Sequence, residues 1–222
     1  MSHLEELREY YYEWWENPKD IRSEVLWRLN EHVRERIPPG KVKRALDIGS
    51  GRGTIVSYLV EKGHDVTAVD ISEKFASELK RKFPDVEAVC GDARNINFSR
   101  RLHITTCIEV AQNLNEKDLR GMSDGLAGVT DMLFISMSKK NSLHSHWVNL
   151  RGFKKSFVFN YSPSEFEKLL TEASFQVIYR RGIGLVTPIS LFPNFKIPLI
   201  TSPLASLINR VDKYATKICH LY

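Results

Sequence analysis

The 222-residue sequence contains only three cysteines, and none of them belongs to a CxxC pair. Cys90, Cys107 and Cys219 cannot all pair with one another, and the first two lie in apolar, strand-like runs. This usage argues against a disulfide-stabilised secreted domain and favours buried thiols in a reducing compartment. No cluster of cysteine and histidine has the spacing of a zinc site. We therefore predict no bound metal and a cytoplasmic location.

The sequence also lacks an uninterrupted apolar run of membrane-spanning length. Its most apolar part, residues 183–211, is broken by Pro188, Pro193, Pro198 and Pro203, and a helix across a bilayer would not tolerate so many prolines. The N-terminus is charged and amphipathic and does not have the pattern of a signal peptide. Repeats and low-complexity tracts are absent as well. We expect a soluble protein with one full hydrophobic core.

Charge is distributed unevenly along the chain, although its net value is only +5. Residues 1–36 carry nine acidic and six basic side chains, whereas residues 175–222 carry six basic and one acidic. A tail that is both basic and apolar could contact an anionic membrane surface. The basic residues are dispersed, so we predict no nucleic-acid partner and leave peripheral membrane contact open.

Apolar strands and amphipathic helices alternate along the middle of the chain. The expected strands are residues 44–48, 65–70, 86–90, 102–108, 131–138 and 175–179. The expected helices are residues 54–61, 72–83 and 118–129, and one that begins at Ser162. Strands separated by single helices imply a parallel sheet with helices on both faces. We predict an α/β, doubly wound, mostly parallel seven-stranded Rossmann-like sheet.

Aromatic residues are concentrated near the N-terminus, within two expected helices separated by Asn17-Pro18. They include three consecutive tyrosines at 10–12 and the pair Trp14-Trp15. Such a cluster either covers a ligand pocket or packs against the sheet. We predict an N-terminal helical lid at residues 1–40 and a ligand-binding Rossmann-like domain at 41–182. Residues 183–222 would complete the sheet or cap the site of an acceptor substrate.

A glycine-rich turn joins the first expected strand to the helix that follows it. The turn contains Gly49, Ser50, Gly51 and Gly53. Glycine permits a tight turn and lets the backbone approach a ligand without an intervening Cβ. A dinucleotide fingerprint reads GxGxxG, but this turn reads GxGxG and continues with Thr54. The pattern therefore predicts a nucleotide-type site and disfavours a nicotinamide oxidoreductase.

Acidic residues stand at the ends of three consecutive expected strands: Asp47, Asp70 and Asp92. Ligands of open parallel sheets bind outside the carboxyl ends of the strands. An acid about 20 residues after the glycine turn suits hydrogen bonds to ribose hydroxyls. Each acid alone could be a capping or turn residue, but their joint placement favours one ligand site.

The segment Leu46–Gly53 resembles the first motif of the class I S-adenosylmethionine-dependent methyltransferases. Val69–Ser72 resembles their second motif, Cys90–Ala93 their third, and Thr106–Val110 the motif of their fourth strand. The ordered spacing of these motifs across residues 42–135 is more specific than the glycine turn alone. The layout is most similar to the quinone-biosynthesis and related small-molecule methyltransferases.

This resemblance implies S-adenosylmethionine as the cofactor and assigns contacts with it to ten residues. They are Asp47, Gly49, Ser50, Gly51, Gly53, Asp70, Ile71, Asp92, Ala93 and Glu109. The glycines would line the methionine moiety, with Asp47 supporting their turn. Asp70 would hold the ribose hydroxyls, and Asp92 with Ala93 would meet the adenine. Glu109 would lie near the amino-acid end of the cofactor or at the mouth of the acceptor pocket.

The acceptor side of the site is less constrained by the sequence. Members of this family usually have a histidine after the fourth-strand motif, but Asn113 stands there in this chain. His144 and His146, after the fifth expected strand, are the candidates for a general base, and both could equally be surface residues. We predict methyl transfer to a small-molecule acceptor, such as an apolar quinone or lipid precursor. The alternatives are a methyltransferase-like binding module without turnover and methylation of a macromolecule.

Overall fold

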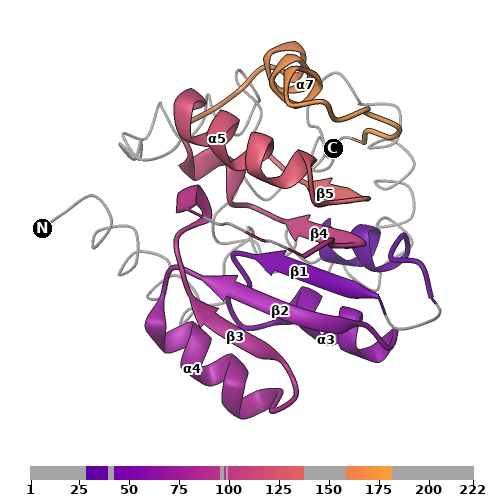
Figure 1. Cartoon of the computed structure of the whole chain (residues 1–222), viewed down its shortest axis with the longest axis vertical. Coiled ribbons are helices and arrows are strands. Elements are labelled where there is room, and N and C mark those ends of the chain that lie inside the picture. The colour runs from indigo at the N-terminus through magenta and orange to yellow at the C-terminus, as the bar shows by residue number, and fades with distance from the viewer. Residues whose placement is uncertain (1–28, 40–42, 96–97, 99, 138–158, 182–222) are drawn as a thin grey trace, which may run out of the picture.

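The computed structural model describes residues 29–39, 43–95, 98, 100–137 and 159–181 (Figure 1). Within them, five strands form one parallel sheet in the order β3-β2-β1-β4-β5. The strands are β1 (Arg44–Ile48), β2 (Asp65–Asp70), β3 (Glu87–Cys90), β4 (Ile104–Cys107) and β5 (Leu133–Ile135). The predicted α/β class and the parallel, Rossmann-like sheet are confirmed.

The order of strands in the sheet reverses after β3. The strands β1, β2 and β3 lie side by side in sequence order, and β4 then pairs with the other side of β1. The strands are closely in register, with Ile48 of β1 opposite both Val69 of β2 and Cys107 of β4. The carboxyl ends of β1, β2 and β4 therefore lie in one row, with the switch in strand order between β1 and β4. Open α/β sheets bind their ligands at such a point.

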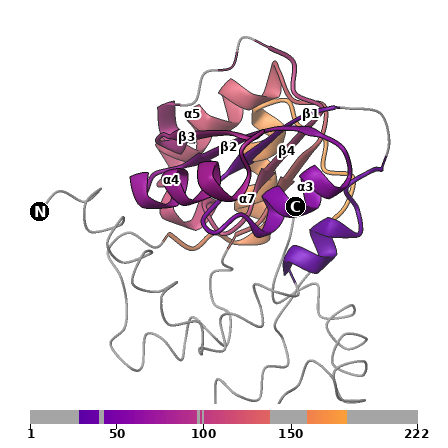
Figure 2. The ribbon, with the colours of Figure 1, turned by 90° about the horizontal axis from the view of Figure 1, so that it is seen from below.

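Helices cover both faces of this sheet (Figures 1 and 2). They are α3 (Thr54–Glu61), α4 (Glu73–Lys82), α5 (Glu116–Ala127) and α7 (Pro163–Glu172). Successive side chains of a strand point to opposite faces, so Leu46 and Ile48 join the apolar cluster under α5 and α7, while Ala45 joins the cluster under α3. Residues 29–34 are helical and pack in the second cluster. Both faces are apolar because both are covered.

The helix boundaries follow local signals in the sequence. The Ser72 hydroxyl accepts a hydrogen bond from the backbone N–H of Phe75 at the start of α4. Ser162 and Glu165 form a reciprocal capping box at the start of α7, with Pro163 in the first turn. These arrangements satisfy backbone donors that the helix itself leaves unpaired, and they confirm the predicted starts of both helices.

The predicted sixth strand over Phe175–Tyr179 is wrong, because the structure assigns no strand to these residues. Phe175 and Val177 are partly buried against the cluster under α5 and α7, whereas the side chain of Ile178 is 78% exposed. The alternation that suggests a strand is thus real, but a strand also requires a hydrogen-bonded neighbour, which alternation does not supply. A seven-stranded sheet stays a prediction.

Two other predicted strands are shorter than expected. The fourth covers Ile104–Cys107 and not 102–108, with Leu102 forming only an isolated bridge to Thr130. The fifth covers Leu133–Ile135, whereas 131–138 was expected. Apolar residues extend beyond the paired segment in both cases, so hydrophobicity overestimates the length of these strands.

Cys90 is exposed, which contradicts the prediction that both strand cysteines are buried. It ends β3, which lies at the edge of the described sheet and has only β2 as a paired neighbour. Cys107, in the central strand β4, is buried as predicted, and burial raises the pKa of its thiol. The two thiols differ in exposure because β3 is an edge strand and β4 is a central one, and the sequence did not indicate this strand order.

Several predictions concern residues outside the described part of the chain. They include most of the N-terminal lid, the segment 183–222, and both His144 and His146. Among the described helices, none combines the length and the apolarity needed to cross a bilayer.

Candidate active site

The glycine turn after β1 is tight, as predicted, and its glycines have a left-handed backbone. The φ angles of Gly49, Gly51 and Gly53 are 74°, 48° and 79°, values that residues with a Cβ rarely adopt. A Cβ on Gly49 would also lie 2.1 Å from Cγ2 of Val110, which follows β4. Gly49 is therefore needed for the turn itself and for its close contact with the loop after β4, across the switch point.

Asp70 connects the end of β2 to the glycine turn. Its Oδ2 accepts a hydrogen bond of 2.8 Å from the backbone N–H of Gly51, and its Oδ1 accepts one of 2.8 Å from the N–H of Ser72. Burial raises the pKa of this carboxyl, and the two backbone hydrogen bonds oppose that rise. Each oxygen of a carboxylate has two lone pairs, so Asp70 can accept further hydrogen bonds while it holds the turn.

Asp47 lies beneath the turn and is almost completely buried, with 3% of its surface exposed. Its Oδ1 accepts a hydrogen bond of 2.6 Å from Thr106 of β4, and its backbone carbonyl accepts one of 2.8 Å from the Ser50 hydroxyl. Burial raises the pKa of Asp47 to about 7, against the effect of the Thr106 hydrogen bond, and the nearby Asp70 adds to the rise. No cation pairs with it among the described residues.

Asp92 and Ala93 lie where β3 gives way to the short helix η1 (Ala93–Asn95). This loop is tied to β2 by a hydrogen bond of 2.9 Å from the N–H of Gly91 to the carbonyl of Asp70. Ala93 packs against the core cluster under α5, and both carboxylate oxygens of Asp92 accept hydrogen bonds from Arg94. The third acid therefore lies beside the second, as predicted, but it already has a cationic partner.

Glu109 follows β4 and has the left-handed φ of 61°, which is unusual for a residue with a side chain. Its N–H donates to the Ser136 hydroxyl at 2.7 Å, and that hydroxyl donates to its Oε1 at 3.3 Å. Its Oε2 accepts a hydrogen bond of 2.8 Å from Gln112. Burial raises the pKa of Glu109, against the effect of both side-chain hydrogen bonds. Backbone strain of this kind is concentrated at functional sites.

The structure thus brings the predicted cofactor residues to one edge of the sheet. Asp70 contacts the glycine turn, Asp47 contacts β4, and Val110 places the loop of Glu109 against Gly49. Sequence reasoning missed the side chains that position these acids: Arg94, Thr106, Gln112 and Ser136. Thr106 lies within the fourth-strand motif, but its role depends on Asp47, 59 residues earlier, just as Ser136 acts on Glu109 from 27 residues away. Arg94 and Gln112 are close in sequence to their acids, but they lie outside the motifs. Among the described residues, no three His, Cys, Asp or Glu side chains converge as a metal site.

A family model described as a methyltransferase domain matches residues 45–131. This span runs from β1 to just before β5 and includes all the acids described above. Residues 45–131 therefore match a methyltransferase domain. The resemblance inferred from the motifs is thereby confirmed.

The methyltransferase domain has relatives with different acceptors. Demethylmenaquinone methyltransferase of Beutenbergia cavernae is 33% identical over 111 residues, which cover 50% of this chain and 42% of that protein. Ribosomal RNA small subunit methyltransferase A of Porphyromonas gingivalis is 32% identical over 58 residues, which cover 26% of this chain and 22% of that protein. The chain spans less than half the length of either curated relative.

Solved structures share the fold of the methyltransferase domain. Magnesium protoporphyrin IX methyltransferase from Synechocystis PCC 6803, crystallised with bound S-adenosylmethionine, superposes with a TM-score of 0.61 at 18% identity. The superposition covers 83% of this chain and 91% of that one. At this identity the likeness concerns the fold alone.

Proposed function

We propose that this chain is an S-adenosylmethionine-dependent methyltransferase. One observation carries the proposal: a left-handed glycine turn and the acids Asp70 and Asp92 adjoin one another at the carboxyl edge of a parallel sheet. Ribose hydroxyls and an adenine amino group both donate hydrogen bonds, and carboxylates are their natural acceptors. The family match of residues 45–131 supports the same activity.

The residues at this edge fit the cofactor group by group. Asp70 would hold the ribose hydroxyls with Ile71 beside it, and Asp92 with Ala93 would meet the adenine. The turn of Gly49, Ser50, Gly51 and Gly53, supported by Asp47, would line the methionine moiety. Glu109 would accept from the ammonium group, since its loop touches Gly49. When bound, the cofactor supplies an activated methyl group, so the protein's main contribution is alignment of the acceptor.

The first test compares ligands that share the adenosine but differ at the amino-acid end. By isothermal titration, we expect the protein to bind S-adenosylhomocysteine and not NAD. Glu109→Gln is expected to weaken S-adenosylhomocysteine about tenfold, because it removes the charge that faces the ammonium group. The same variant is expected to bind 5′-methylthioadenosine, which has no amino-acid end, as the wild type does.

The two ligands separate the possible failures of this test. A wild type that gives neither heat nor a rise in melting temperature with S-adenosylhomocysteine would overturn the proposed function. Equal losses for both ligands in Glu109→Gln would instead show that Glu109 supports the whole site and not the ammonium group.

For the acceptor, we propose a small and apolar molecule such as a quinone or lipid precursor. The likeness to demethylmenaquinone methyltransferase supports it, as does the apolar segment within residues 183–222. In this proposal residues 1–40 form a lid over the cofactor domain at 41–182, and residues 183–222 cap the acceptor site or complete the sheet. His144 or His146 would remove the acceptor's proton. Peripheral membrane contact by the basic tail would bring the protein to lipid-soluble acceptors.

The alternative acceptor is RNA, since ribosomal RNA methyltransferases are among the relatives. With methyl-labelled S-adenosylmethionine added to a cell extract, we expect the label to enter the organic-soluble fraction. Label in the RNA or protein fraction would assign a macromolecular acceptor. Cofactor binding without label in any fraction would favour a binding module without turnover.

A further inference from the structure

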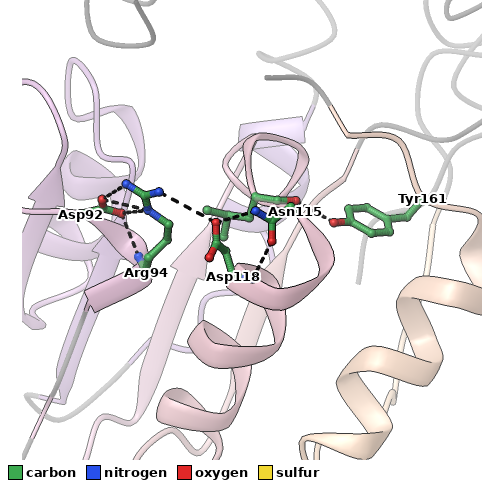
Figure 3. Close-up of polar contacts among 6 residues, drawn as sticks. Asp92, Arg94, Asn115, Asp118 and Tyr161 are labelled. Atoms are coloured by element: carbon green, nitrogen blue, oxygen red, sulfur yellow. Dashed lines mark hydrogen bonds and ion pairs between the residues drawn. The ribbon is translucent and has the colours of Figure 1, made fainter. Parts of the chain in front are cut away.

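Arg94 is hydrogen-bonded to the carboxylate of Asp92, which the proposed function assigns to the adenine. Its backbone N–H donates to Oδ1 of Asp92 at 3.0 Å, its Nε lies 3.0 Å from Oδ1 and 2.9 Å from Oδ2, and its Nη2 also donates to Oδ2 (Figure 3). The side chain of Asp92 is 17% exposed and that of Arg94 is 35% exposed. Any N–H group that approaches Asp92 therefore competes with a guanidinium group for the same oxygens.

A second carboxylate lies on the other side of the same guanidinium group. Oδ2 of Asp118, in the first turn of α5, is 3.9 Å from Nη1 of Arg94. Asp118 is held in place by Asn115, whose Oδ1 accepts its N–H at 2.9 Å and whose Nδ2 donates to its Oδ2 at 2.9 Å. Tyr161 holds the residues just before α5, because its hydroxyl donates a hydrogen bond of 2.6 Å to the carbonyl of Leu114 (Figure 3).

These contacts give Arg94 two acidic partners at unequal distance. Its present position favours Asp92, with which it shares short, charge-assisted hydrogen bonds. A small movement of the guanidinium group toward α5 would shorten the 3.9 Å contact with Asp118 and release Asp92 without leaving the arginine unpaired. Because Asn115 holds Asp118 in place, Asp118 does not have to move to pair with the guanidinium group of Arg94.

We propose that Arg94 and Asp118 together set the affinity of the site for the adenine end of the cofactor, with Asp118 drawing Arg94 away from Asp92. This inference rests on the proposed function, because it takes Asp92 as the acceptor for the adenine amino group. Arg94 competes with the ligand, and Asp118 weakens that competitor. Both are positioning residues, since they act through Asp92.

The test is a set of binding titrations with S-adenosylhomocysteine. Arg94→Ala removes the competitor, and we expect binding about threefold tighter than in the wild type. Asp118→Asn removes the charge that attracts Arg94, and we expect binding about threefold weaker. In the Arg94→Ala background, Asp118→Asn should have no further effect, because the group it acts on is gone.

Glu116→Gln is the matched control, because Glu116 is the other acid in the first turn of α5 and pairs with Arg120. It removes the same charge from the same turn, and we expect wild-type affinity. A general defect in folding would weaken every variant, whereas the inference requires changes of opposite sign.

Three results would overturn the inference: weaker binding by Arg94→Ala, equal affinities of Asp118→Asn and Glu116→Gln, or additive effects in the double variant. If the wild type does not bind S-adenosylhomocysteine, the proposed function fails as well. If the wild type binds it and only the Arg94 and Asp118 variants behave otherwise than expected, the proposed function stands and this inference alone is wrong.

Discussion

Asp70→Ala is expected to reduce the affinity for S-adenosylhomocysteine by about a hundredfold or more. Hydrogen bonds to a charged group contribute about 1.5–3 kcal/mol each, and the carboxylate proposed to hold the ribose would make two of them. The substitution also removes the acceptor for the N–H groups of Gly51 and Ser72, so the glycine turn loses its attachment to β2. Isothermal titration measures the loss directly.

Asp70→Asn keeps the size of the side chain and one oxygen, so it separates the ribose contact from a collapse of the turn. Its circular dichroism should match the wild type while its affinity still falls at least about tenfold. Asp65→Asn is the control, because Asp65 begins the same strand and therefore lies at the opposite end of β2 from the site. Wild-type affinity in both Asp70 variants would show that the ribose is held elsewhere.

Asp47→Asn is expected to stabilise the protein above neutral pH while having little effect in acid. Burial raises the pKa of Asp47 from its usual 3.8 to about 7. Between these values the folded protein retains a proton that the unfolded chain has lost, so the folded state loses stability as the pH rises through this window. Asparagine does not ionise and does not incur this loss.

The expected gain is the free energy that corresponds to this shift, at most about 4 kcal/mol above pH 8, since one pKa unit corresponds to about 1.4 kcal/mol. Denaturant unfolding of both proteins at pH 5 and pH 8.5 measures it as a difference that grows with pH. Asp65→Asn, which alters an exposed acid at the other end of β2, should show no such growth. An Asp47→Asn variant that is destabilised equally at both pH values would show that the Thr106 hydrogen bond outweighs the buried charge.

Local signals in the sequence were sufficient for the elements that hold the site. The second strand is residues 65–70, as predicted, and the N-caps of α4 and α7 are Ser72 and Ser162, where the sequence predicts the starts of two helices. The tight glycine turn was also predicted, and the structure shows its glycines with left-handed φ angles. These features depend on residues within about four positions of one another, because turns and helix ends are satisfied by near neighbours. The approximate position of the site follows from them, since parallel strands end at a common edge.

Only the tertiary structure decided which side chains meet at that edge. Asp47 depends on Thr106 and Glu109 on Ser136, which are separated by 59 and 27 residues in sequence. The return of β4 to the side of β1 makes the first of these contacts. Sheet order likewise left Cys90 at an exposed edge, and α5 brought Asp118 within reach of Arg94. Such contacts depend on which strands and helices become neighbours, and that choice is made by packing of the whole core.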